Sequence, residues 1–246
     1  MKALSLAFLG LLAAKAVAGL RAKEPGGESK QLVIVRGVLY VAILALIIQG
    51  ARCVGYDVAA ELYGWASQDN LARAQSSKAY DNAAQAVRLR PGVLRYWQVL
   101  AATKFARQQF ASLLEDLPTF LALSGGKLEE EDAYRFAAAH FFLGQYDKVI
   151  PLTHRLIEEN RFYTAPYVLQ GYAHTAQRKY PEAERAFLDV LQIFPTQQVA
   201  VEGLAHLYFL AGNRAGALGI LNETAKHPFP PGSRKRFEDL KALYAQ

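Results

Sequence analysis

The stretch that decides the fold is residues 164–197, TAPYVLQGYAHTAQRKYPEAERAFLDVLQIFPTQ. Large and small residues follow a fixed order in it: Tyr167, Gly171, Tyr180, Ala183, Phe187, Val190 and a closing Pro195. The small residue at Gly171 has counterparts along the chain, and the full series is Ser67, Ala101, Ala137, Gly171 and Ala205. The steps between them are 34, 36, 34 and 34 residues. A period of this length is typical of stacked helix-turn-helix units.

The order of residues within 164–197 resembles the tetratricopeptide repeat (TPR) family. The resemblance implies an all-α fold, a right-handed α-solenoid of about five helix-turn-helix repeats. We expect the repeats at 60–93, 94–127, 130–163, 164–197 and 198–231, followed by a capping helix over 233–246. Small residues at helix crossings keep the axes about 8–10 Å apart. Because Leu113 and Val149 replace the alanine of the second helix, we expect repeats 94–127 and 130–163 to be less regular.

The resemblance also implies a concave face that is lined by the first helices of the repeats and binds partners. The positions that point to this face in the family give the candidate partner-binding residues Gln98, Phe105, Tyr134, Phe141, Tyr172, His206 and Phe209, with Phe142 in the same set. Aromatic side chains dominate binding hot spots, so this face fits an apolar or helical segment of a partner. The lysine and asparagine set with which some members grip a terminal carboxylate is absent. A structural interpretation stays open, in which several of these aromatics pack between adjacent helices.

Residues 1–56 have the character of a membrane anchor. The apolar stretch from Val33 to Cys53 spans about 30 Å as a helix, which matches a hydrocarbon core, and we expect a transmembrane helix over 32–54. The earlier stretch, 4–20, reaches only about 25 Å. Three interpretations of it stay open: a second membrane helix, a cleaved secretory signal that ends at Ala16-Val17-Ala18, or an organelle-targeting segment.

The charges around these stretches predict an orientation. Arg21, Lys23, Lys30 and Arg36 stand between the two stretches or at the start of the second, and basic loops stay on the cytoplasmic side. We therefore expect a one- or two-pass protein of the plasma (inner) membrane with its repeats in the periplasm or an equivalent space. Cleavage after Ala18 would reverse this orientation.

The composition argues against nucleic-acid binding and against an enzyme. The chain of 246 residues has a net charge of +6, but residues 1–56 hold seven Lys or Arg and two Asp or Glu, which leaves 21 and 20 for the rest. A basic binding face is therefore not indicated in the repeats. No catalytic or cofactor-binding motif occurs, and we expect no catalytic residue, cofactor or metal. Cys53 is the single cysteine and has no partner for a disulfide.

Three functional hypotheses follow. The first is a membrane-anchored scaffold or adaptor, which mediates protein–protein interaction as a subunit of a membrane-associated complex and contacts lipid through its amino-terminal helices. The second is a transient assembly or maturation factor for exported or membrane proteins. The third is the accessory tail of a membrane enzyme, such as a polysaccharide ligase.

Overall fold

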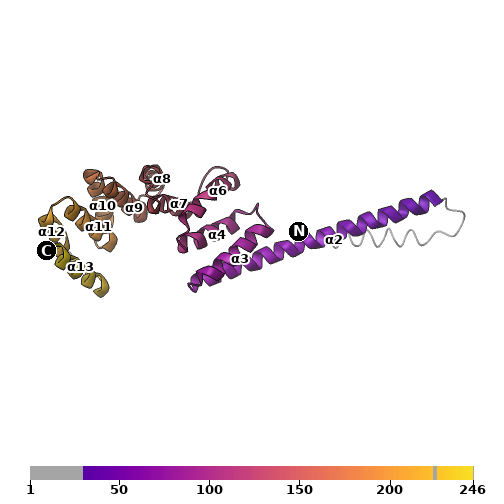
Figure 1. The fold of residues 1–246 in the computed structure, drawn as a ribbon, viewed down its shortest axis with the longest axis horizontal. Coiled ribbons are helices and arrows are strands. Elements are labelled where there is room, and N and C mark those ends of the chain that lie inside the picture. The colour runs from indigo at the N-terminus through magenta and orange to yellow at the C-terminus, as the bar shows by residue number, and fades with distance from the viewer. Residues whose placement is uncertain (1–29, 224–225, 246) are drawn as a thin grey trace. The chain divides into compact units, whose positions relative to one another are not determined.

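The computed structural model describes residues 30–223 and 226–245, and within these ranges no strand occurs. Figure 1 shows a succession of helices joined by short turns. Their bounds are α2 Lys30–Ala72, α3 Ser76–Leu89, α4 Leu94–Ala106, α5 Phe110–Glu115, α6 Leu117–Leu123, α7 Glu130–Phe142, α8 Tyr146–Glu159, α9 Thr164–Ala176, α10 Tyr180–Ile193, α11 Gln198–Leu210, α12 Arg214–Glu223 and α13 Pro231–Tyr244. The all-α helical repeat expected from the sequence is confirmed for this part of the chain. The apolar stretch 4–20 lies outside the described residues.

The turns after α2, α4, α7, α9 and α11 share one backbone geometry. Each contains a residue with positive φ, between 57° and 80°, namely Ala74, Gln108, Gly144, Arg178 and Gly212. After Gly144, the N–H of Gln145 donates to the carbonyl of His140 at 2.9 Å, and the equivalent bond forms at the other four turns. This is the Schellman motif, which satisfies the last carbonyls of a helix. The motif recurs with the same 34, 36, 34 and 34 residue steps as the small residues.

The small residues themselves lie where helices cross. Ser67, Ala101, Ala137 and Ala205 have no exposed surface, and Gly171 is buried as well. A side chain at Gly171 would meet the ring of Phe187 at 2.7 Å, a distance at which something must shift. The period in the sequence therefore reflects the packing distance between helices.

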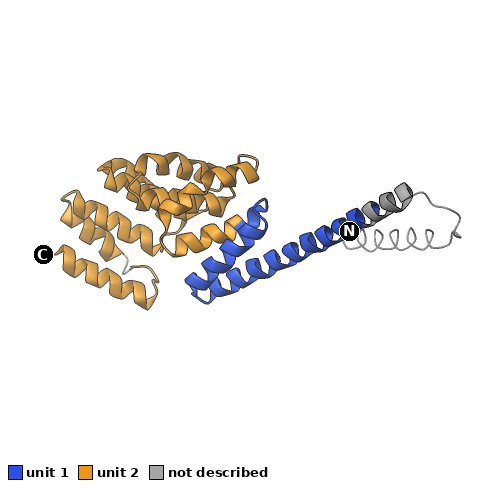
Figure 2. Cartoon of the chain, turned by 45° about the vertical axis from the view of Figure 1, so that its right-hand side comes forward, with its two compact units in different colours: residues 1–96 blue, residues 97–246 orange. Residues whose placement is uncertain are grey.

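The chain forms two compact units, residues 1–96 and 97–246 (Figure 2). In the first unit, α2 packs against α3, and the buried Ser67 hydroxyl donates to the carbonyl of Ala79 at 2.6 Å. Gly64 lets the ring of Tyr96 approach, because a Cβ there would lie 3.0 Å from it. Helix α2 runs without a break through residue 56, where the sequence predicts the end of the membrane anchor.

The second unit is built from the helix pairs α7–α8, α9–α10 and α11–α12, with α13 packed against α11 and α12. Repeat 94–127 is irregular as expected, because its second helix is divided into α5 and α6 at Asp116. The same expectation is wrong for repeat 130–163. Its second helix, α8, is continuous, and Val149 is fully buried in place of the alanine.

Among the described residues, the stretch Val41–Ala72 of α2 is long and apolar enough to cross a membrane by length and composition. None of its most apolar segment is buried within the protein. Cys53, on the same helix, is exposed.

Candidate protein-binding surface

Six aromatic residues of the second unit form a continuous series of ring contacts, which we call the aromatic row. Its members are Phe105 of α4, Phe110 of α5, Phe141 and Phe142 of α7, Tyr146 of α8 and Tyr172 of α9. Phe110 and Phe142 stack with their ring centroids 4.5 Å apart. Phe141 contacts Phe142 at 5.6 Å and Tyr172 at 6.5 Å. The row therefore extends over three successive repeats.

Two members of the row lie at the carboxy-terminal ends of α4 and α7. Phe105 and Phe141 occupy equivalent places, because the carbonyl of each accepts a hydrogen bond from the left-handed residue of its turn, Gln108 or Gly144. Both rings are half-buried, and both pack against the core cluster that includes Ala137 and Val149. Phe142 differs from them, since 58% of its surface is exposed. The row thus combines packing between helices with an accessible edge at Phe142.

Tyr172 and Tyr134 remain neutral at physiological pH. Tyr172 packs edge-on against Phe187 at 5.2 Å, and its hydroxyl donates to the carbonyl of Val199 at 3.4 Å. Burial raises the pKa of Tyr172 to about 12. Tyr134, which lies 5.7 Å from Tyr163, also has its pKa raised by burial. The predicted binding residues of α7 and α9 therefore present an uncharged aromatic surface.

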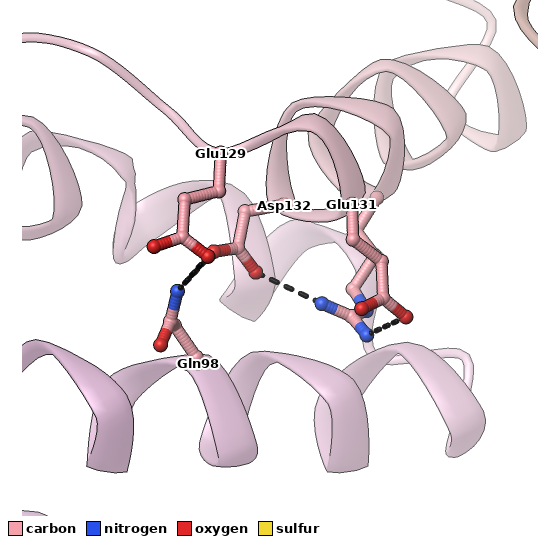
Figure 3. A network of polar contacts seen from close by, with 5 residues as sticks. Gln98, Glu129, Glu131 and Asp132 are labelled. Carbon is pink, nitrogen blue, oxygen red and sulfur yellow. Dashed lines mark hydrogen bonds and ion pairs between the residues drawn. The ribbon is translucent and has the colours of Figure 1, made fainter. Parts of the chain in front are cut away.

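Gln98 lies in a polar network rather than in the aromatic row (Figure 3). Its amide nitrogen donates to Glu129 at 3.0 Å and to Asp132 at 2.9 Å. Arg135 donates to the other oxygen of Asp132 at 2.9 Å. Burial raises the pKa of Asp132, and the hydrogen bond from Gln98 acts in the opposite direction. Gln98 therefore ties α4 to the start of α7.

His206 and Phe209 contact the carboxy-terminal helix. The ring of Phe209 stacks on Tyr244 of α13 with centroids 4.5 Å apart, and His206 Nδ1 lies 3.3 Å from the Tyr244 hydroxyl. Tyr244 is only 3% exposed. The chain's own carboxy-terminal helix therefore packs against Phe209, while His206 stays exposed.

The structure thus brings Phe105, Phe141 and Tyr172 into one row, with Tyr134 packed against the same core cluster. Gln98 and the pair His206 and Phe209 lie in separate surroundings. The candidate set predicted from the sequence missed Phe110, although it stands at the same place in the repeat as Tyr146 and Tyr180, in steps of 36 and 34 residues.

The described residues contain no group of three or more His, Cys, Asp or Glu side chains that could hold a metal ion. His140 is buried and its Nδ1 lies 2.8 Å from the Gln145 side-chain oxygen. Burial lowers the pKa of His140 and of His174, which favours the neutral form of both imidazoles. The two histidines have the surroundings of packed side chains.

Comparison with solved structures identifies the class of fold. MamA from Desulfovibrio magneticus RS-1 superimposes with a TM-score of 0.62 at 15% identity, over 68% of this chain and 94% of that one. PilF from Pseudomonas aeruginosa gives 0.57 at 15% identity, over 77% and 90%. YrrB, described as a TPR protein with an unusual peptide-binding site, gives 0.54 at 16% identity, over 65% and 81%. The chain has the helical-repeat fold of TPR proteins.

Comparisons of sequence find no such likeness. No model of a protein family matches the chain, and no curated protein is significantly similar to it. The similarity to the solved structures is therefore one of fold. This is expected of repeats that keep small residues at a few helix crossings and vary at other positions.

Proposed function

We propose that the chain is a membrane-anchored scaffold of a membrane-associated complex, and that its aromatic row docks an apolar or helical segment of a protein partner. TPR folds present surfaces for protein partners, and a peptide-binding site is part of the description of YrrB. The observation that carries the proposal is the exposed edge of the row at Phe142. Aromatic residues are enriched at the cores of protein interfaces, and the exposed ring of Phe142 is held in place by its aromatic neighbours.

The surroundings of Phe142 favour an uncharged partner segment. Its neighbours Phe105, Phe110 and Phe141 are apolar. The nearby Tyr172 is uncharged at physiological pH, as an ordinary tyrosine is, and burial raises its pKa further. An amphipathic helix that inserts apolar side chains at positions i, i+3 and i+4 suits such a row. A charged terminal carboxylate finds no cation within the row.

The proposed anchor is α2, which exposes a long series of apolar side chains. Leu44, Leu46 and Ile48 are 59, 71 and 51% exposed, a state that water disfavours and lipid accommodates. The basic residues before and at the start of α2 support a plasma-membrane protein with its repeats on the outer side. In this arrangement the partner is a periplasmic protein or the outer part of a membrane protein.

Affinity capture from membranes dissolved in mild detergent tests the proposal. We expect the full chain to recover a protein partner, and we expect Phe142→Ala to weaken capture by about 30-fold, the equivalent of a 2 kcal/mol hot spot. Leu188→Ala is the matched control, because Leu188 of α10 is 38% exposed and lies outside the row. Circular dichroism checks that both variants fold.

Two outcomes would count against the proposal. Recovery of the chain alone, as a monodisperse species, would exclude a stable complex. Equal capture by the wild type and Phe142→Ala would remove the row as the docking surface. Stoichiometric recovery favours a permanent subunit, whereas substoichiometric recovery that depends on the client favours a maturation factor.

A further inference from the structure

An apolar stripe runs along one face of α2 and continues into the first repeat. Its members Val54, Val58, Leu62 and Trp65 follow one another in steps of four, four and three residues, the spacing of a single helix face. Their exposed fractions are 38, 54, 63 and 69%. We call these four residues the α2 stripe.

The α2 stripe lies away from the face that packs against α3. Ser67, which bonds to Ala79 of α3, comes two residues after Trp65 and is therefore about 200° around the helix from it. Ala60 and Gly64, which are buried, share the face of Ser67. One side of α2 thus holds the repeat together, and another side exposes large apolar groups.

The two ends of the array differ in the polarity of their exposed surfaces. The outer surface of a terminal repeat has to be polar if it faces water. At the carboxy-terminal end α13 meets this need, with Arg234, Lys235, Glu238 and Asp239 exposed. At the amino-terminal end the first helix carries the α2 stripe instead.

The position of the stripe indicates what covers it. Ile47 and Ala51 precede Val54 on the same helix face and lie in the proposed membrane span, and both are exposed. The face that would contact lipid within the span therefore continues for 11 residues past Val54, or about 16 Å. Its last member is a tryptophan, the residue that prefers the boundary between acyl chains and headgroups.

We infer that the α2 stripe docks on the headgroup layer of the lipid bilayer and holds the first repeat against the membrane surface. This inference rests on the proposed membrane anchor. An amphipathic helix binds such a layer through its buried apolar area. The first repeat is then fixed close to the bilayer rather than carried on a free stalk.

The distances allow this placement only when α2 tilts toward the stripe. Asp57 forms an ion pair with Arg90, so the hydrocarbon core ends before Asp57. Trp65 lies eight residues further on, about 12 Å along an upright helix and about 9 Å along one tilted by 40°. The polar layer of each leaflet is about 5–8 Å thick. Because side chains lean toward the amino-terminal end of a helix, the ring of Trp65 reaches this layer when α2 tilts toward the stripe.

The chain offers a direct probe, because Trp65 and Trp97 are its two tryptophans. We would place the Trp97→Phe variant of the full chain in phosphatidylcholine vesicles that contain lipid brominated near the headgroup. We expect the emission of Trp65 to shift to the blue and to be quenched by the brominated lipid.

A matched pair of variants tests which face of α2 contacts the lipid, at a constant depth in the bilayer. In a Trp65→Phe, Trp97→Phe background, Leu62→Trp places the probe on the stripe, and Tyr63→Trp places it at the same depth on another face. Tyr63 is 40% exposed. We expect strong quenching for Leu62→Trp and much weaker quenching for Tyr63→Trp.

The outcomes separate this inference from the proposed anchor. If the chain fails to sediment with the vesicles after alkaline washing, the anchor itself is wrong. If it sediments but Trp65 is not quenched, the anchor stands and the inference is overturned. Equal quenching at positions 62 and 63 also overturns it, as does a blue shift that depends on protein concentration instead of lipid, which would assign the stripe to a second copy of the chain.

Discussion

Phe187 shows how single residues set the spacing of this array. Its ring is fully buried and lies between two glycines of successive first helices. A Cβ added at Gly171 would lie 2.7 Å from the ring, and one added at Gly203 would lie still closer to it. A large residue in one helix therefore requires the absence of a side chain in two others.

This arrangement predicts the effect of Gly203→Ala. The added methyl group overpacks the contact with Phe187, so we expect the free energy of unfolding to fall by about 1–3 kcal/mol. Gly219→Ala is the control: nothing lies within 4 Å of its Cβ position in α12, and we expect a gain of about 0.5–1 kcal/mol from better helix propensity. Urea unfolding of the full chain in detergent, followed by circular dichroism, compares the two. Equal effects would contradict the proposed close contact.

For single residues, the sequence predicted the small residues at the helix crossings but not all of the turn residues. The series from Ser67 to Ala205 could be read because closely packed helices tolerate only small residues. Of the five turn residues with positive φ, only Gly144 and Gly212 are glycines, the residue type that adopts this conformation readily. Ala74, Gln108 and Arg178 adopt positive φ because packed helices fix the turn, and local propensity does not reveal this.

At the scale of elements, α2 and the pair α5–α6 depart from a regular array. The sequence indicated an apolar span and a first repeat as separate segments, whereas α2 joins them in one helix, Lys30–Ala72. No proline or glycine pair interrupts this stretch, so nothing ends the helix between them. In repeat 94–127, by contrast, Asp116 separates α5 from α6, and Pro118 lies in the first turn of α6.

A buried ion pair stabilises the break between α5 and α6. Lys104 of α4, which is 6% exposed, donates to Asp116 at 2.6 Å and to the carbonyl of Ser112 at 3.1 Å. Burial raises the pKa of Asp116, and Lys104 opposes this effect. The lysine therefore offsets part of the cost of burying the Asp116 carboxylate where α5 ends and α6 begins.

We expect Lys104→Met to lower the free energy of unfolding by about 3 kcal/mol, because it leaves the Asp116 carboxylate buried without a partner. Adding Asp116→Leu should recover most of this loss, since an apolar pair needs no hydrogen bonds. Urea unfolding of the single and double variants measures the coupling. Additive losses in the double variant would show that the two residues act independently.

At the scale of the whole molecule, the proposed account joins a membrane helix, a TPR-type array and an aromatic docking row. The sequence predicted four members of the row, Phe105, Phe141, Phe142 and Tyr172, because the repeat frame assigns them to one face. It could not predict that Gln98 binds Glu129 and Asp132, or that α13 covers Phe209. Those contacts depend on how neighbouring repeats pack against each other. The residue pattern within a single repeat does not determine this packing.

The most direct test of the central claim is photo-crosslinking in intact membranes. A photoreactive amino acid at position 142 reports which protein touches the exposed edge of the row, and the same probe at position 188 serves as the control. We predict a discrete protein adduct of the membrane-bound chain from position 142 and none from position 188. Identical adducts from both positions, or none from 142 while the chain is in the membrane, would contradict the docking role of the row.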